Sequence, residues 1–213
     1  MDKDIYETVK KMLEETKKRN FKESVDMAVN LQYVDLSDPK KRLNEEIILP
    51  HGRGKPIKVA VFASGETAQK AKNIADLVIS PEEIDKLAED KRRAKKLANE
   101  YDYFIAEAPL MTKIGKVLGG ILGPRGKMPK PIPAGSDPTQ LIQNLKKTVR
   151  VRTREKRTFH VPVGTRDMSP EQITENIEEV IKKIVSKLEK GKGNIESIYI
   201  KTTMGPSYKL EVK

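Results

Sequence analysis

The pattern of hydrophobic residues changes twice along the chain, and this constrains the fold more than any other feature. Residues 59–63 and 103–106 are continuous apolar runs, which are typical of strands covered on both faces. Residues 24–32 and 198–204 instead alternate between apolar and polar side chains, which indicates strands buried on one face only. The sequence therefore predicts two kinds of β-sheet in one chain of 213 residues.

Helical segments separate the apolar runs in the middle of the chain. The predicted helices cover residues 65–75, 81–100 and 109–118, and a fourth begins near residue 138 and includes Leu141, Ile142 and Leu145. Ser80-Pro81-Glu82-Glu83 is a capping box that starts the second of them. Residues 118–133 contain four glycines and four prolines, which predicts a loop. The alternation of strand and helix over residues 57–148 indicates a small parallel sheet flanked by helices, as in a Rossmann-like three-layer α/β/α domain.

The two ends of the chain are each too small to form a domain. One helix (2–18) and two strands (24–32 and 44–49) precede the central region, and one helix (170–189) and about four strands follow it. The first 50 residues cannot bury a stable core alone. We therefore predict an α+β discontinuous two-domain protein, with a split α/β terminal domain (1–51 and 150–213) and an inserted domain (52–149).

The charge of the chain favours a polyanionic partner. There are 42 Lys and Arg against 31 Asp and Glu, a formal net charge of +11, and such an excess most often serves nucleic acid. Arg150, Arg152 and Arg154 alternate with apolar residues and would share one strand face, where they could contact phosphates. A soluble basic protein without such a partner, or an edge strand protected by charge, is the alternative.

Other classes of protein find little support. The chain has no cysteine and only His51 and His160, so thiolate and histidine metal sites are not expected. Residues 118–133 do not fit a P-loop, because Ile121 stands where glycine is needed and Met128 where Ser or Thr is needed. No catalytic residue, metal or cofactor is predicted. No apolar run is long enough to span a membrane, and no signal peptide is recognisable, so we expect a soluble intracellular protein.

Four stretches of the sequence together resemble a known family. They are Asn20-Phe21-Lys22-Glu23-Ser24-Val25, His51-Gly52-Arg53-Gly54-Lys55, residues 121–129 (Ile-Leu-Gly-Pro-Arg-Gly-Lys-Met-Pro) and Thr202-Thr203-Met204-Gly205-Pro206-Ser207. In this order and spacing they resemble the universal large-subunit ribosomal protein L-one family (uL-one), in its archaeal type. Asn20 stands where many members have Lys.

The resemblance implies a non-enzymatic protein that is cytoplasmic and ribosome-bound, and monomeric when free. Its terminal domain would bind large-subunit rRNA and form the mobile stalk near the tRNA exit site, assisting release of deacylated exit-site tRNA. It would also repress translation by binding an rRNA-like element in the leader or coding region of its own mRNA. The rival hypotheses are an enzyme that uses the Rossmann-like domain on a phosphorylated substrate, and a nonspecific RNA chaperone.

The resemblance also implies the RNA-binding residues. The main surface would comprise Phe21, Lys22, Glu23, Ser24, Thr203, Met204, Gly205, Pro206 and Ser207. Flanking contacts would come from Arg53, Lys55, Arg154, His160 and Lys201. A secondary basic loop in the inserted domain would contribute Arg125, Lys127 and Lys130.

Overall fold

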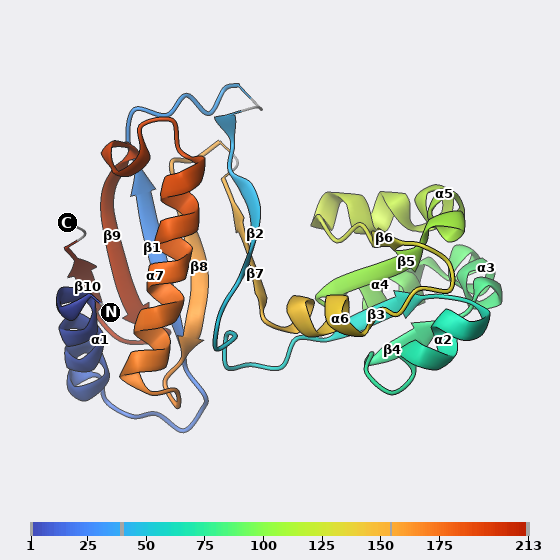
Figure 1. Cartoon of the computed structure of the whole chain (residues 1–213), viewed down its shortest axis with the longest axis horizontal. Helices are drawn as coiled ribbons and strands as arrows, with labels where there is room; N and C mark the ends of the chain where they lie inside the picture. Colours follow the sequence, from blue (N-terminus) through green and yellow to red (C-terminus); the bar gives the residue numbers. More distant parts are fainter. Residues whose placement is uncertain (1, 39–40, 154, 212–213) are drawn as a thin grey trace. The chain divides into compact units, whose positions relative to one another are not determined.

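The chain forms two compact units in a computed structural model that describes residues 2–38, 41–153 and 155–211. The terminal unit comprises Met1–Lys55 and Lys147–Lys213, and the central unit comprises Pro56–Lys146 (Figure 1). Helices and sheets are mixed in both, so the predicted combination of α and β structure is confirmed. The terminal unit ends at Lys55 and resumes at Lys147, whereas the predicted boundaries are residues 51 and 150. Lys147 and Thr148 belong to the terminal unit because the Leu49 N–H donates to the Lys147 carbonyl at 3.0 Å and Thr148 pairs with Ile48.

The terminal unit is built on a four-stranded antiparallel sheet in the order β10-β9-β1-β8. Its strands are β1 (Ser24–Leu31), β8 (Thr158–Thr165), β9 (Ile195–Thr202) and β10 (Ser207–Leu210). Helices α1 (Lys3–Glu15) and α7 (Pro170–Lys187) cover one face (Figure 1), and the short 3-10 helix η2 (Gly191–Asn194) precedes β9. A separate ribbon pairs β2 (Asn44–Ile48) with β7 (Thr148–Arg152).

The alternating sequence of β1 explains why one face of this sheet is covered and the other is open. Val25, Met27 and Val29 are fully buried against the helices, while Asp26 and Ala28 point to the opposite face and are half-buried. We call that opposite side the open face. Because Ser24 pairs with Thr165 and Val25 with Thr202, the start of β1 lies between the ends of β8 and β9.

The central unit is built on a parallel sheet in the order β4-β3-β5-β6. Its strands are β3 (Val59–Phe62), β4 (Leu77–Ile79), β5 (Tyr103–Glu107) and β6 (Lys130–Ile132). Helices α3 (Pro81–Glu89), α4 (Lys91–Glu100) and α5 (Ala108–Arg125) share one apolar cluster with Phe62 and Phe104. Helices α2 (Gly65–Ala71) and α6 (Thr139–Lys146) share another with Val61 and Ile105, so helices lie on both faces of the sheet.

The predicted loop 118–133 is wrong in its first half, because α5 continues to Arg125. Ile114, Leu118 and Leu122 are spaced four apart and all buried, and this apolar stripe outweighs the cost of about 1 kcal/mol for each helical glycine. The helix ends at Gly126, whose φ is +67°. There the N–H groups of Lys127 and Gly126 donate to the carbonyls of Leu122 and Gly123 at 2.9 and 2.8 Å, a Schellman motif. Part of the remainder is strand β6.

The predicted helix 81–100 is also wrong, because it is divided at Asp90 into α3 and α4. The Asp90 carboxylate accepts the N–H groups of Arg92 and Arg93 at 2.9 and 3.0 Å, so it caps a new helix. Among the described residues, no helix is long and apolar enough to cross a membrane.

Candidate nucleic-acid interface

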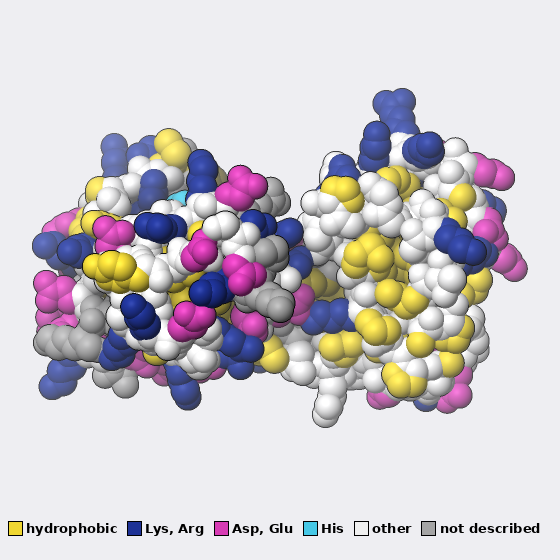
Figure 2. Space-filling model, turned by 90° about the horizontal axis from the view of Figure 1, so that it is seen from above, with side chains coloured by type: hydrophobic (Ala, Val, Ile, Leu, Met, Phe, Trp, Pro, Cys, Tyr) yellow, Lys and Arg dark blue, Asp and Glu magenta, His cyan; other side chains and the backbone are white. Residues whose placement is uncertain are grey.

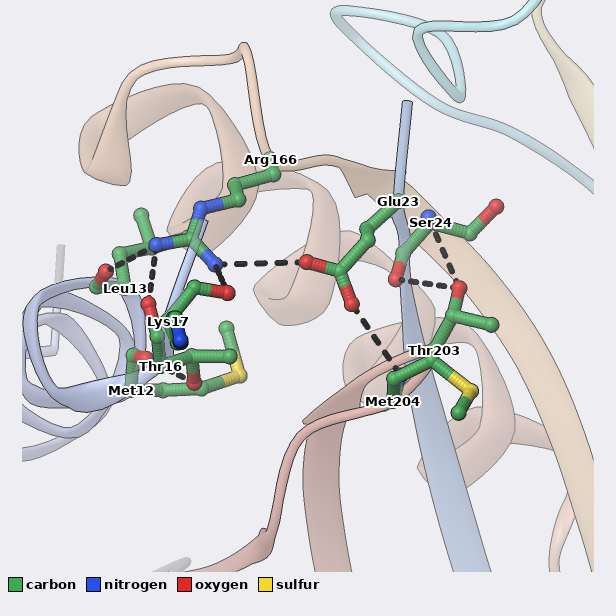
Figure 3. A network of polar contacts seen from close by, with 9 residues as sticks. All are labelled: Met12, Leu13, Thr16, Lys17, Glu23, Ser24, Arg166, Thr203 and Met204. Atoms are coloured by element: carbon green, nitrogen blue, oxygen red, sulfur yellow. Dashed lines mark hydrogen bonds and ion pairs between the residues drawn. The ribbon is translucent and has the colours of Figure 1, made fainter. Parts of the chain in front are cut away.

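Two segments from opposite ends of the chain are joined at one end of the terminal sheet. The Ser24 N–H donates to Thr203 Oγ1 at 3.1 Å, and the Thr203 N–H donates to the Ser24 carbonyl at 3.1 Å. These residues are 179 positions apart in the sequence. Figure 3 shows the resulting contact between the residue that starts β1 and the turn that follows β9. The geometry therefore brings together the two stretches that the resemblance assigns to the main RNA-binding surface.

A buried carboxylate lies beneath this junction and accepts a hydrogen bond from the turn. The Glu23 side chain is fully buried, and its Oε1 accepts the Met204 N–H at 3.1 Å. Its Oε2 forms an ion pair with Nη1 of Arg166 at 3.3 Å (Figure 3). Glu23 thus lies beneath the surface rather than on it, and its charge orients the backbone of the turn.

Arg166 is a residue that sequence reasoning missed. Its guanidinium donates to the carbonyls of Leu13 and Lys17 at 3.1 and 3.0 Å, and also to the carbonyl of Thr16. These carbonyls lie at and just beyond the end of α1, where the last carbonyls of a helix lack internal partners and favour a cation. Arg166 therefore connects the end of α1 to Glu23. No local sequence pattern reveals it, because it lies 143 residues from Glu23.

Large apolar side chains are exposed beside this network. Phe21, two residues before Glu23, is 51% exposed, and Met204 is 58% exposed. Exposed aromatic side chains can stack on unpaired bases. Gly205 is packed closely, because a Cβ there would lie 2.4 Å from Thr202 Oγ1 and 2.9 Å from Thr16 Cγ2. We refer to Phe21, Ser24, Thr203, Met204 and Gly205 as the turn surface.

The residues predicted to flank this surface lie on several elements of the terminal unit. Lys22 forms an ion pair with Asp167 at 3.8 Å, and Pro206 and Ser207 are exposed at the start of β10. His160 and Lys201 lie on the open face of the sheet. Arg53 and Lys55 follow β2, and Arg154 lies outside the described residues.

Two other predicted features have contacts within the terminal unit. The guanidinium of Arg150 donates to Asn44 Oδ1 at 3.0 and 3.2 Å across the β2–β7 ribbon, whereas Arg152 is exposed. Nε2 of His51 lies 2.5 Å from Oε2 of Glu175, and the backbone N–H of His51 donates to Asn176 Oδ1 at 3.1 Å. These contacts give His51 a structural environment.

The secondary basic residues belong to the central unit. Nε of Arg125 donates to Asn99 Oδ1 at 3.2 Å, and Nη1 donates to the Ile121 carbonyl at 3.0 Å. Nζ of Lys127 donates to the carbonyls of Ala98 and Tyr101 at 2.9 and 2.7 Å, which caps the end of α4. Lys130 is half-buried in β6. Two of these three cations therefore stabilise the central unit itself.

Comparison with known proteins places the chain in a family. Residues 13–206 match the ribosomal protein L1p/L10e family. The chain belongs to this family. It is 60% identical to the large ribosomal subunit protein uL1 of Picrophilus torridus over 203 residues, which cover 95% of each chain. It is 55% identical to the uL1 protein of Thermoplasma acidophilum, over 98% of this chain and 96% of the relative.

A third relative, the uL1 protein of Methanocella arvoryzae, is 56% identical over 98% of both chains. The resemblance inferred from the motifs is therefore confirmed, including its archaeal type. In the view of Figure 2, Lys and Arg side chains are interspersed with Asp and Glu over the terminal unit and do not form a single basic patch.

Proposed function

We propose that this protein is a non-catalytic RNA-binding protein of the large ribosomal subunit, and that its turn surface binds large-subunit rRNA. The observation that carries this proposal is the hydrogen-bonded junction of Ser24 and Thr203, with Phe21 and Met204 exposed beside it. Membership in a ribosomal protein family and relatives named as large-subunit proteins support it.

Recognition at this surface would depend on shape and on the RNA backbone. The Ser24 and Thr203 hydroxyls suit contact with ribose 2′-hydroxyls and phosphates, and Phe21 suits stacking on an unpaired base. Glu23 and Arg166 hold the backbone in place. The cations Lys22, Arg53, Lys55, Arg154 and Lys201, with His160, would supply the salt-dependent part of the affinity.

The finer biological role extends this proposal. The terminal unit would hold the mobile stalk near the tRNA exit site, and the protein would assist release of deacylated tRNA from there. By binding an rRNA-like element in its own mRNA, it would also repress translation. The central unit would be a Rossmann-like insertion in a split RNA-binding domain, with Arg125, Lys127 and Lys130 as a secondary surface. We propose that the free protein is a cytoplasmic monomer.

The central unit contains a feature that disfavours the rival enzyme hypothesis. Parallel α/β sheets bind ligands beyond the carboxyl ends of the strands, where the strand order reverses, which here is between β3 and β5. Glu107 ends β5 and is buried. Its Oε2 accepts the N–H and the hydroxyl of Ser64, which follows β3, at 3.2 and 2.8 Å. A carboxylate in this position repels a phosphate and occupies the N–H that would bind it.

A competition experiment tests the class of function. The full chain is titrated with a transcript of the large-subunit rRNA stalk element at fixed salt, against an unrelated hairpin as competitor. The proposal expects the hairpin to compete poorly. Equal competition would favour a nonspecific RNA chaperone. A thermal shift with ATP or NAD, but none with the stalk element, would favour the enzyme.

A further inference from the structure

Asp26 is a half-buried acidic residue on the open face of the terminal sheet. It is half-buried in the middle of three strands, with Lys201 opposite it on β9 and Pro162 opposite it on β8. Within the described part of the chain, its carboxylate makes no hydrogen bond and no ion pair within 4.0 Å. Partial burial of a charge that lacks such a partner costs free energy, so this position needs a physical explanation.

The carboxylate of Asp26 lines a shallow pocket of about 620 Å³, within the size range of roughly 300–1,000 Å³ for small-ligand sites. The lining is contributed by all four strands of the sheet and the turn after β9. It includes Asp26, His160, Tyr199, Lys201, Thr203 and Ser207. Because Thr203 also belongs to the turn surface, the pocket is continuous with the predicted RNA-binding site.

The chemistry of these side chains suits a nucleotide. Tyr199 and His160 offer ring faces on which a base can stack, and Lys201 offers a cation for the neighbouring phosphate. An ionised Asp26 can only accept hydrogen bonds, and it accepts best from two parallel donors. Among the four RNA bases, guanine alone presents two adjacent donors, N1–H and N2–H, on its Watson–Crick edge.

We propose that this pocket binds an unpaired guanine of the RNA, and that Asp26 selects it by accepting hydrogen bonds from N1–H and N2–H. The inference rests on the proposed function, because it takes RNA as the ligand. It adds a base-specific contact to a surface that otherwise reads shape and backbone.

The electrostatics of the free protein agree with this role. Burial raises the pKa of Asp26, and the positive charges of Lys55 and Lys201 together with His160 only partly oppose the effect. The charged form is thus held at a cost in the folded protein. A partly buried charge that the chain itself compensates only in part is expected at functional sites.

Short single-stranded RNAs test the proposal directly with the full chain. The probes are the heptamers UUUGUUU, UUUIUUU (inosine, which lacks the 2-amino group) and UUUUUUU, titrated at pH 7 and fixed salt. We expect the guanine heptamer to bind about tenfold more tightly than the uridine heptamer, within the discrimination typical of a bidentate base contact. Inosine should be intermediate.

Asp26→Asn should abolish the guanine preference, because an amide cannot accept two hydrogen bonds in parallel. Glu196→Gln is the matched control: it removes one negative charge from an exposed residue of β9 and should keep the preference. A preference that survives in Asp26→Asn, or is absent from the wild type, overturns the inference.

The same samples separate this inference from the proposed function. If the chain binds the rRNA stalk element selectively but does not distinguish guanine in the heptamers, the inference is wrong and the proposed function stands. If guanine is preferred in the heptamers but the stalk element competes no better than an unrelated hairpin, the pocket is supported and the ribosomal role fails.

Discussion

Each unit contains a buried glutamate that organises a junction of backbone segments, but the two junctions differ in outcome. In the terminal unit, Glu23 pairs with Arg166 and accepts the Met204 N–H. In the central unit, Glu107 accepts two bonds from Ser64. The first arrangement supports an exposed turn, whereas the second fills the crevice where α/β proteins bind ligands. A buried glutamate that accepts backbone N–H groups can therefore support an exposed binding surface or fill a potential binding crevice.

The largest expected effect comes from breaking the ion pair. Arg166→Met leaves the Glu23 carboxylate buried without its cation and removes the donor to three carbonyls near the end of α1. Loss of one partner of a buried pair costs about 3–5 kcal/mol, and we expect that loss in the free energy of unfolding, measured by urea denaturation.

Glu107→Gln provides the comparison for this prediction. This substitution keeps one acceptor oxygen for Ser64 and leaves no buried cation unpaired. It should therefore lower the free energy of unfolding by only about 1 kcal/mol. The double variant Arg166→Met with Glu23→Gln should recover part of the loss, since the partners are coupled. Equal costs for Arg166→Met and Glu107→Gln would show that the two junctions do not differ as described.

A pair of glycine substitutions should change stability in opposite directions. A Cβ on Gly205 would lie 2.4 Å from Thr202 Oγ1, so Gly205→Ala should destabilise the terminal unit by about 1–3 kcal/mol through overpacking. Gly119 lies within α5 with no atom within 4 Å of an added Cβ, so Gly119→Ala should stabilise by about 0.5–1 kcal/mol. Thermal unfolding measures both, and effects of the same sign would contradict the packing described for the turn surface.

A smaller effect is expected from Asp26→Asn, and it should depend on pH. The folded-state pKa of Asp26 is raised, so its contribution to stability is greatest at acid pH. That contribution is lost as the pH rises through the unfolded and then the folded pKa. The amide that replaces the carboxylate does not titrate, so the variant should be more stable than the wild type near pH 7 and equal to it at acid pH.

Lys55, Lys201 and His160 face this carboxylate. Melting temperatures at several pH values measure the difference. A variant less stable than the wild type at neutral pH would show that Asp26 is compensated inside the free protein.

Much of the fold follows from hydrophobic periodicity. The helix α7 and the alternating strand β1 were predicted closely, because one face of each is apolar over many residues. The strand predicted at residues 198–204 is displaced, since β9 spans Ile195–Thr202 and Met204 is exposed in the turn that follows. The extent of α5 was missed because glycine and proline are strong local signals, whereas the deciding contacts of Leu118 and Leu122 are tertiary. Strand β6 is short and contains Pro131, so no strand pattern was visible.

The site was predictable only in part. Motif resemblance indicated Ser24 and Thr203, and the structure joins them. The buried position of Glu23 and the role of Arg166 depend on contacts between residues far apart in the sequence, as in the 143-residue separation of that pair. From the sequence, Asp26 is one of several polar residues in an alternating strand. The pairing of β1 with β8 and β9 places it in the middle of the open face, opposite Lys201.

The central claim is that the turn surface binds large-subunit rRNA, and a titration of Thr203→Val tests it most directly. Thr203 Oγ1 accepts the Ser24 N–H, and valine keeps its shape without the hydroxyl. Thr112→Val, at an exposed threonine of α5, is the matched control. We predict that Thr203→Val weakens binding to the rRNA stalk element by about 1–3 kcal/mol while the protein stays folded, and that Thr112→Val binds as the wild type does. Unchanged affinity in Thr203→Val, or equal losses in both variants, would contradict the account.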